Sequence, residues 1–332
     1  MDFCSTSVEY SSEQIPIDIL IEIFLRLPAK SILRFRCVSK QWASILCRPD
    51  FTDLFLTFSS DRPRLLFTFQ VDGKWFFFSA PQRQDPDQNL SHDVIIVDNH
   101  MRIPTRMCSF WIHRPVRGLV FPKGVRIKRG CNDSKAMVIC NPVLTVHNNT
   151  QIIFTRNRQH SGEHQVLTLG TGKLSWRMIE CSLHQLPDCD GICIDGVFVT
   201  YPLTLMNYKG ELGAIQFNMN GYLCGRSTSL ELRVLDDAEK HKWSVKTYIL
   251  SLFWKDFAVD TSRYYHFVGM TDNSELVFSP FIISDPFYIF YYNLGRNTTV
   301  RVRIHGIEFV KNQYIYTFLN HVDDVKPMYV SA

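Results

Sequence analysis

The stretch IPIDILIEIFLRLPAKSILRFRCVSKQW, residues 15–42, begins with a segment that is apolar on most of its circumference. Pro16 suits the first turn of a helix, where its missing N–H costs no hydrogen bond, and Pro28 ends the helix. Three charged residues, each four positions after the last, form one narrow polar stripe along it: Asp18, Glu22 and Arg26. A helix with this pattern is predicted to be buried on most of its sides.

Two further short helices and the start of another element follow. AKSILRFRCV carries one apolar set, and SKQWASIL begins at Ser39, a suitable N-cap. Another short element begins at Phe51. Three short helices in about 40 residues form a core too small to be stable unaided. The surplus apolar surface must therefore be covered either by the rest of the chain or by a partner.

This N-terminal stretch resembles an F-box, the motif that binds an SKP-type adaptor in cullin-RING ubiquitin ligases. Ile15 stands where the family usually has leucine. The positions that carry the resemblance are Pro16, Leu20, Ile23, Leu27, Pro28, Leu33, Arg34, Val38, Lys40 and Trp42. The adaptor-binding residues that it implies are Pro16, Leu20, Ile23, Phe24, Leu27, Pro28, Leu33, Val38 and Trp42.

An ordinary helical cap on the following domain is the alternative reading of these helices. It is favoured if Leu20, Phe24 and Leu27 are covered by the β domain, out of reach of a partner.

After residue 64 the pattern changes to short runs rich in Val, Ile, Phe, Tyr and Thr, typical of strands. Several of them read as strand, polar turn, strand, with Asp72-Gly73 as the clearest hairpin turn. The predicted hairpins are LLFTFQVDGKWFFFSA, HQVLTLGTGKLSWRMIEC, LELRVLDDAEKHKWSVKTYIL, PFYIFYYNLGRNTTVRVRI and a looser KAMVICNPVLTVHNNTQIIFT. Repetition on this scale favours the radial blades of a propeller over a β-sandwich.

Residues 110–326 resemble the F-box-associated domain of large plant F-box families. The matching words, in order, are RGLV, ICNP, HQVLTLGTGKLSWRMIEC, DGICIDGV, NYKGELG, LRVLDDAEKHKWS, LVFSP, FYYNL and LNHVDDVK. The resemblance implies a kelch-like propeller that presents one face to a substrate. The intervals after ICNP and after DGICIDGV are shorter than in the family, so one or two blades are expected to lack strands and to expose their edges.

The expected architecture is thus a multidomain α+β chain. It consists of a disordered leader (1–12), a three-helix F-box (13–58), a linker (59–64), an all-β, propeller-like and incomplete domain (65–326) and a tail (327–332).

Composition agrees with a globular protein of the cytoplasm and/or nucleus. Apolar residues make up 45% of the 332, charged residues 20%, and the net charge of +4 gives no reason to invoke nucleic acid. The apolar run at the N-terminus is too interrupted for a membrane span, and residues 1–14 lack the pattern of a secretory signal. The ten cysteines have no C-x-x-C spacing, which fits reduced thiols rather than disulfides or zinc.

Three short motifs resemble known metal-binding, phosphate-binding or nucleic-acid-binding sequences. His160, Glu163 and His164 match H-x-x-E-H, but this zinc motif needs a helix and Gly162 interrupts it. LGTGK lacks the spacing of a phosphate loop and reads as a hairpin turn. KGVRIKRG, residues 123–130, reads as a solvated basic loop rather than a nucleic-acid patch.

The preferred hypothesis is a non-catalytic adaptor without a cofactor or metal. Its partners would be an SKP-type adaptor, cullin through that adaptor, and a target protein of unknown identity held by the β domain, with no nucleic acid and no membrane. The alternatives are a metal-dependent hydrolase that uses His160, Glu163 and His164, a stand-alone ligand-binding propeller, and a degenerate copy without substrate binding.

Overall fold

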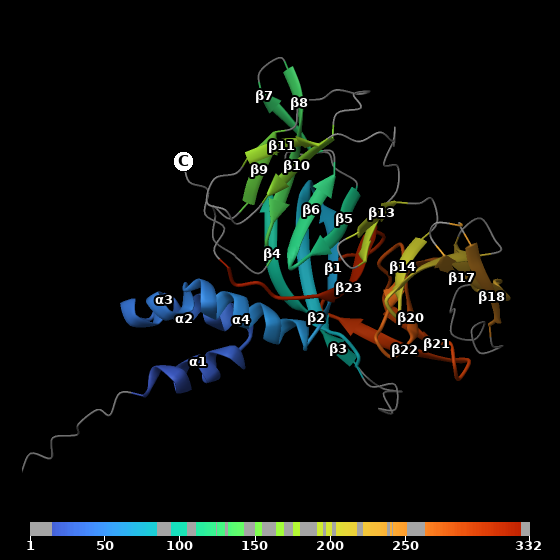
Figure 1. The fold of residues 1–332 in the computed structure, drawn as a ribbon, viewed down its shortest axis with the longest axis horizontal. Helices are drawn as coiled ribbons and strands as arrows, with labels where there is room; N and C mark the ends of the chain where they lie inside the picture. The colour runs from blue at the N-terminus through green and yellow to red at the C-terminus, as the bar shows by residue number, and fades with distance from the viewer. Residues whose placement is uncertain are drawn as a thin grey trace, which may run out of the picture.

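The computed structural model places four helices beside a set of β-sheets (Figure 1). It describes residues 15–84, 94–104, 111–123, 125–129, 132–142, 150–154, 164–168, 175–179, 191–194, 197–200, 204–217, 222–237, 240, 242–250 and 263–326. The predicted leader (1–12) and tail (327–332) lie outside these residues.

The N-terminal unit contains four helices, one more than the three expected. They are α1 (Ile17–Leu25), α2 (Ala29–Phe35), α3 (Lys40–Leu46) and α4 (Pro49–Ser60). The fourth is the longest because Pro49 supplies its first turn and the apolar positions after Phe51 recur at helical spacing. It reaches Ser60, and the first strand begins at Arg64, so the connection is shorter than the predicted linker of 59–64.

The first and last strands of the chain pair with each other, which is how a circular array of sheets is closed. The sheet has the order β23-β1-β2-β4. Its strands are β1 (Arg64–Val71), β2 (Lys74–Pro81), β4 (Asp98–Pro104) and β23 (Ile315–His321). β1 and β2 form the predicted hairpin, with Asp72 and Gly73 both at positive φ as such a turn requires.

The described residues form five further sheets around this closing sheet. The largest, β16-β19-β20-β21-β22-β3, contains β16 (Leu223–Cys224), β19 (Tyr264–Met270), β20 (Glu275–Pro280), β21 (Phe287–Asn293), β22 (Thr298–His305) and β3 (Val94–Ile96). A four-stranded sheet contains β14 (Thr204–Tyr208), β15 (Glu211–Phe217), β17 (Ser229–Asp237) and β18 (Lys242–Ile249). A five-stranded sheet contains β5 (Trp111–Val116), β6 (Leu119–Lys123), β7 (Val125–Arg129), β8 (Asn132–Cys140) and β9 (Thr150–Phe154).

Two of the sheets have only two strands in the part of the chain that the structure describes. One pairs β10 (His164–Thr168) with β11 (Ser175–Ile179), and the other pairs β12 (Gly191–Ile194) with β13 (Val197–Thr200). These small sheets occupy the region where shortened blades were expected. All five predicted hairpins are present as antiparallel strand pairs.

Neighbouring sheets pack face to face, as the blades of a propeller do. Alternate residues of β1 face opposite sides: Phe67 and Phe69 pack toward β21 and β22, whereas Leu66 packs toward β5 and β6. The sheet of β19–β22 in turn contacts β15 and β17 through a third cluster that includes Phe278. Burial on both faces explains why β1 and β2 read as continuous apolar runs rather than as alternating ones.

Candidate functional site

The four helices enclose a small core of their own. Phe24 of α1 lies at its centre, with its ring 5.2 Å from that of Trp42 and 6.5 Å from that of Phe51. Ser39 caps α3 as predicted, its hydroxyl oxygen accepting a hydrogen bond from the Trp42 amide at 3.1 Å. The other buried members of the cluster are Leu20, Leu25, Ala29, Ile32, Leu46, Phe55 and Val325.

The C-terminal segment of the chain completes this helical core. Val325 is fully buried among the helices, and its carbonyl oxygen accepts a hydrogen bond from Arg36 Nη2 at 2.6 Å. The same Arg36 nitrogen donates to the Leu46 carbonyl at 2.8 Å, so one side chain joins α2, α3 and the C-terminal segment. In Figure 1 this segment runs from β23 back to the helices. The helices are therefore fixed to the β domain by packing as well as by the covalent chain.

Two of the short motifs that carry the family resemblance, ICNP and RGLV, contact the C-terminal segment on the side away from the helices. Asn141 of ICNP donates its side-chain amide to the Asp324 carbonyl at 2.8 Å. Gly118 of RGLV has φ +77°, and a Cβ built there would lie 2.7 Å from the Val322 carbonyl oxygen. The backbone conformation and the close approach both require glycine at this turn. We call residues 322–326, with their contacts to Gly118, Asn141 and Arg36, the C-terminal clamp.

The predicted adaptor-binding residues divide into three groups by exposure. Pro16, Ile23, Pro28 and Val38 are exposed, Leu27, Leu33 and Trp42 are half-buried, and Leu20 and Phe24 are buried. The prediction of a contact surface through Leu20 and Phe24 needs correction, because both side chains already fill the helical core. They are covered by the other helices and by Val325, not by a β-sheet, so the helical unit keeps an open apolar side.

That open side is a row of isoleucines, of which the predicted adaptor-binding residues include only Ile23. Ile15, Ile19 and Ile23 are spaced four residues apart, and each exposes between 44% and 53% of its surface. Ile17 is also exposed, but it lies two positions before Ile19 and therefore on the opposite side of the helix. We call Ile15, Ile19 and Ile23 the isoleucine row. The sequence signal was present: Ile19 and Ile23 directly follow Asp18 and Glu22 of the polar stripe, which marks the side of α1 that faces water.

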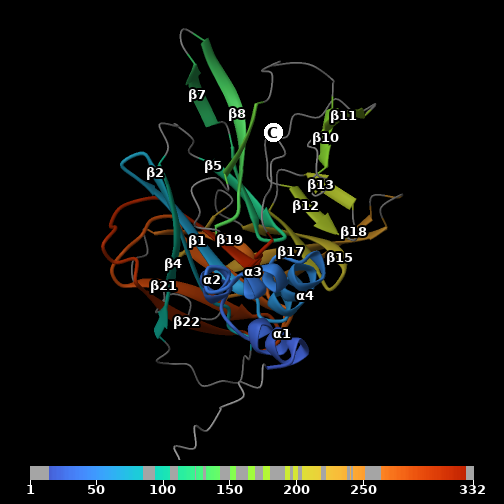
Figure 2. The ribbon, with the colours of Figure 1, turned by 90° about the vertical axis from the view of Figure 1, so that its left-hand side faces the viewer.

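The face beside the isoleucine row is polar and weakly paired. Arg26 forms an exposed ion pair with Glu22 at 3.2 Å, one helical turn earlier. Such a pair contributes only about 0.3–0.5 kcal/mol. The isoleucine row and the charged residues beside it therefore form an exposed surface that is partly apolar and partly charged. Such a surface is suited to binding a protein partner. In Figure 2 the helices lie in front of the sheets, and α1 lies below the other three.

The three short motifs considered for other chemistry lie in strands or outside the described residues. His164 starts β10, a strand paired with β11, while His160 and Glu163 lie outside the described residues. The LGTGK turn also falls largely outside them. Residues 125–129 of the basic stretch form β7, so reading the stretch as a loop is wrong there: the alternation of Val and Ile with charged residues fits a strand. Within the described residues, no helix is long and apolar enough to cross a membrane.

Comparison with known proteins gives two family matches in the same order along the chain. Residues 12–54 match the F-box domain. Residues 64–202 and 198–322 match, as two segments, the F-box associated beta propeller domain. The two segments overlap at residues 198–202, inside the interval that is predicted from the sequence to be shortened. The more specific kelch-like character stays a prediction.

Relatives in Arabidopsis thaliana align over nearly the whole chain. The F-box protein At3g49450 is 38% identical over 373 residues, covering 95% of this chain and 92% of the relative. The F-box protein DOR is 39% identical over 370 residues, covering 95% of this chain and 94% of the relative. Both alignments are longer than the 332 residues of this chain, so the relatives contain segments that it lacks.

Proposed function

This chain belongs to the plant F-box proteins that carry an F-box associated beta propeller domain, and on that premise we propose that it is a substrate-recognition adaptor of an SCF (cullin-RING) ubiquitin ligase. The helical unit binds an SKP-type adaptor and through it cullin, and the β domain holds a target protein for ubiquitination. The chain is non-catalytic, since the transfer chemistry belongs to other subunits. Tethering the target beside the transfer machinery raises its effective concentration there.

The isoleucine row is the observation that carries this proposal. A small helical unit with a filled core has no folding reason to leave Ile15, just before α1, and Ile19 and Ile23 within it exposed in one row. Burying apolar area against an adaptor contributes about 25 cal/mol per Å², and the neighbouring Asp18 and Glu22 would lie at the rim of such a contact. The contact surface is therefore centred on Ile15, Ile19 and Ile23, with Val38 as a further exposed candidate.

A capture experiment with the double variant Ile19→Asp/Ile23→Asp tests the adaptor contact. Desolvating two carboxylates in place of two apolar side chains should weaken capture of an SKP-type adaptor by at least ~100-fold, about 3 kcal/mol. Ile282→Asp is the matched control, because Ile282 has the same 44% exposure as Ile23 but lies on the β domain. Wild-type capture by the double variant would refute this surface.

Leu27→Lys is a poorer test of the same contact. Leu27 is half-buried and packs against the helical core, so its replacement disturbs folding as well as any interface. We also place the protein in the cytoplasm and/or nucleus. The free thiols of Cys37 and Cys47 fit a reducing compartment, and a fluorescent fusion observed in living cells checks the location.

A further inference from the structure

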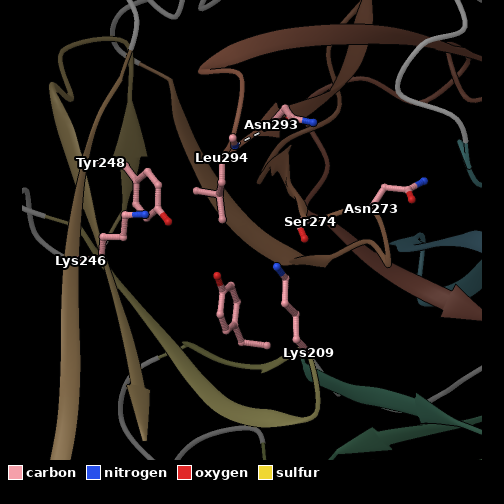
Figure 3. A pocket seen from close by; sticks show the side chains of 9 residues that line it. Lys209, Lys246, Tyr248, Asn273, Ser274, Asn293 and Leu294 are labelled. Carbon is pink, nitrogen blue, oxygen red and sulfur yellow. Dashed lines mark hydrogen bonds between the residues drawn. The ribbon is translucent and has the colours of Figure 1, made fainter. Parts of the chain in front are cut away.

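A pocket of about 360 Å³ lies on the β domain where the hairpin ends of two sheets meet. The sheet of β14 and β18 supplies Tyr208, Lys209, Lys246 and Tyr248 to its lining. The β19–β20 and β21–β22 turns supply Ser274 and neighbouring residues. Figure 3 shows Lys246 and Tyr248 on one side, Lys209 and Ser274 on the other, and Leu294 between them.

The floor of the pocket is part of the packed core. Leu294 is buried in the cluster that joins the two sheets, and Tyr208 and Tyr248 pack against that cluster with part of their surface exposed. The turn that carries Leu294 is held by Asn293, whose side-chain oxygen accepts hydrogen bonds from the amides of Gly295 and Arg296, each at 3.0 Å. The pocket is therefore supported by rigid elements, which lowers the entropic cost of binding.

The charge of the pocket has one sign. Among the residues that the structure describes, the nine that line the pocket include two lysines and no aspartate or glutamate. Each ammonium group lies near an aromatic face: Lys246 Nζ is 5.0 Å from the Tyr248 ring centroid, and Lys209 Nζ is 5.7 Å from that of Tyr208. A ring restrains the position of a cation without neutralising it. Both lysines remain exposed and so face an incoming ligand with their full charge.

The chemistry of these groups selects an anion with an attached carbon chain. The two ammonium groups and the hydroxyl of Ser274 all line the pocket, and each can donate a hydrogen bond to an anion bound there. The tyrosine faces and Leu294 offer apolar contact beside them. A free inorganic ion would leave that apolar surface unused. An acidic side chain on a polypeptide uses both.

We propose that this pocket binds an anionic side chain, a phosphate or a carboxylate, on a segment of the target protein. The proposal rests on the substrate-adaptor function proposed above and adds to it the chemical class of the recognised segment. The sequence could not indicate the site. Lys209 follows β14 and Lys246 lies within β18, and nothing in their spacing shows that they meet.

Fluorescence anisotropy with three peptide mixtures tests the proposal on the purified full-length chain. The peptides have equal length and degenerate flanks, and their central residue is fixed as phosphoserine, glutamate or serine. We expect the phosphoserine mixture, the glutamate mixture or both to bind at least tenfold more tightly than the serine mixture. Preference for phosphoserine alone assigns the anion to phosphorylation, and equal preference for both acids assigns it to negative charge in general.

The variant Lys209→Gln/Lys246→Gln should lose that preference and bind all three mixtures alike. Lys242→Gln is the matched control, since Lys242 lies on the same strand β18 but does not line the pocket. The proposal is overturned if the wild type does not discriminate between the mixtures, or if the double variant still does. Capture of an SKP-type adaptor by the wild-type chain is measured separately. If the chain fails to capture the adaptor, the proposed adaptor function is contradicted, but the measured peptide preference still supports the anion-binding pocket.

Discussion

Replacing Val325 by alanine should loosen the N-terminal helices, although the substitution lies 265 positions beyond the last residue of α4, Ser60. Val325 is the one residue from the far end of the described chain within the buried helical core, where it packs in the same cluster as Phe51 and Phe55. Its removal leaves space that the short helices cannot refill without moving. The effect should therefore appear first in the helical unit and only weakly in the sheets.

The magnitude follows from the two methyl groups that are lost. Each buried methylene-sized group contributes about 0.8 kcal/mol, and the residual cavity adds to this, which gives a total of about 2 kcal/mol. If the helices open locally, their opening equilibrium shifts by the same free energy, about 30-fold. Because Val325 is fully buried in a cluster of other buried apolar side chains, we expect little relaxation to reduce this value.

Hydrogen exchange followed by mass spectrometry measures this local opening. Amides of α1 to α4 should exchange about 30-fold faster in Val325→Ala than in the wild type, while amides of β21 keep their rate. Val245→Ala, an exposed valine on β18, is the control and should change neither region. Unchanged exchange in the helices of Val325→Ala would show that the C-terminal clamp does not hold them.

Three more predictions concern single residues. Phe24→Ala should cost about 3–5 kcal/mol of helical stability because Phe24 is only 1% exposed, and urea denaturation of the helices measures it. Gly118→Ala should lower the free energy of unfolding by more than ~1 kcal/mol, since the positive φ and the 2.7 Å approach to the Val322 carbonyl oxygen both oppose a Cβ. Its melting temperature should fall accordingly, and an unchanged melting temperature contradicts this. Burial, with the nearby Arg64 as a smaller cause, lowers the pKa of His321 from 6.5 to about 3. As the pH falls, the unfolded chain therefore binds a proton at His321 before the folded chain does. The neutral, buried His321 contributes its full stabilisation above pH 6.5, and this stabilisation is lost as the pH falls toward 3, by up to ~1.4 kcal/mol per pH unit. Denaturation between pH 7 and pH 4 should show a shallower pH slope for His321→Gln than for the wild type.

The local parts of the fold could be predicted from the sequence because their causes are local. Asp72-Gly73 fixes a tight turn between β1 and β2, and Ser39 caps α3, whatever the rest of the chain does. The pairing of β1 with β23 has no such signal, since both strands read only as apolar runs. Long-range pairing depends on which surfaces fit together, and a single sequence does not display that.

The candidate site shows the same division. Periodicity showed that α1 is apolar nearly all round, but the helical core buries Leu20 and Phe24 and leaves Ile19 and Ile23 outside. The polar stripe indicated the solvent side, yet which side is filled depends on Val325, a residue that joins the helices only through the closure of the β domain. The pocket between Lys209 and Lys246 depends in the same way on how two hairpins meet.

The C-terminal clamp gives a reason for this long-range construction. In the proposed complex the isoleucine row holds the adaptor and the pocket holds the target, so the two must keep a constant relative position for tethering to raise the effective concentration of the target. A flexible linker alone would let the helices turn away from the β domain. Arg36, Asn141 and Gly118 instead fix the C-terminal segment that contains Val325 from the helical side and from the sheet side at once. Weakening the clamp should therefore lower target ubiquitination by an assembled ligase even where adaptor capture and peptide binding, measured separately, are each retained.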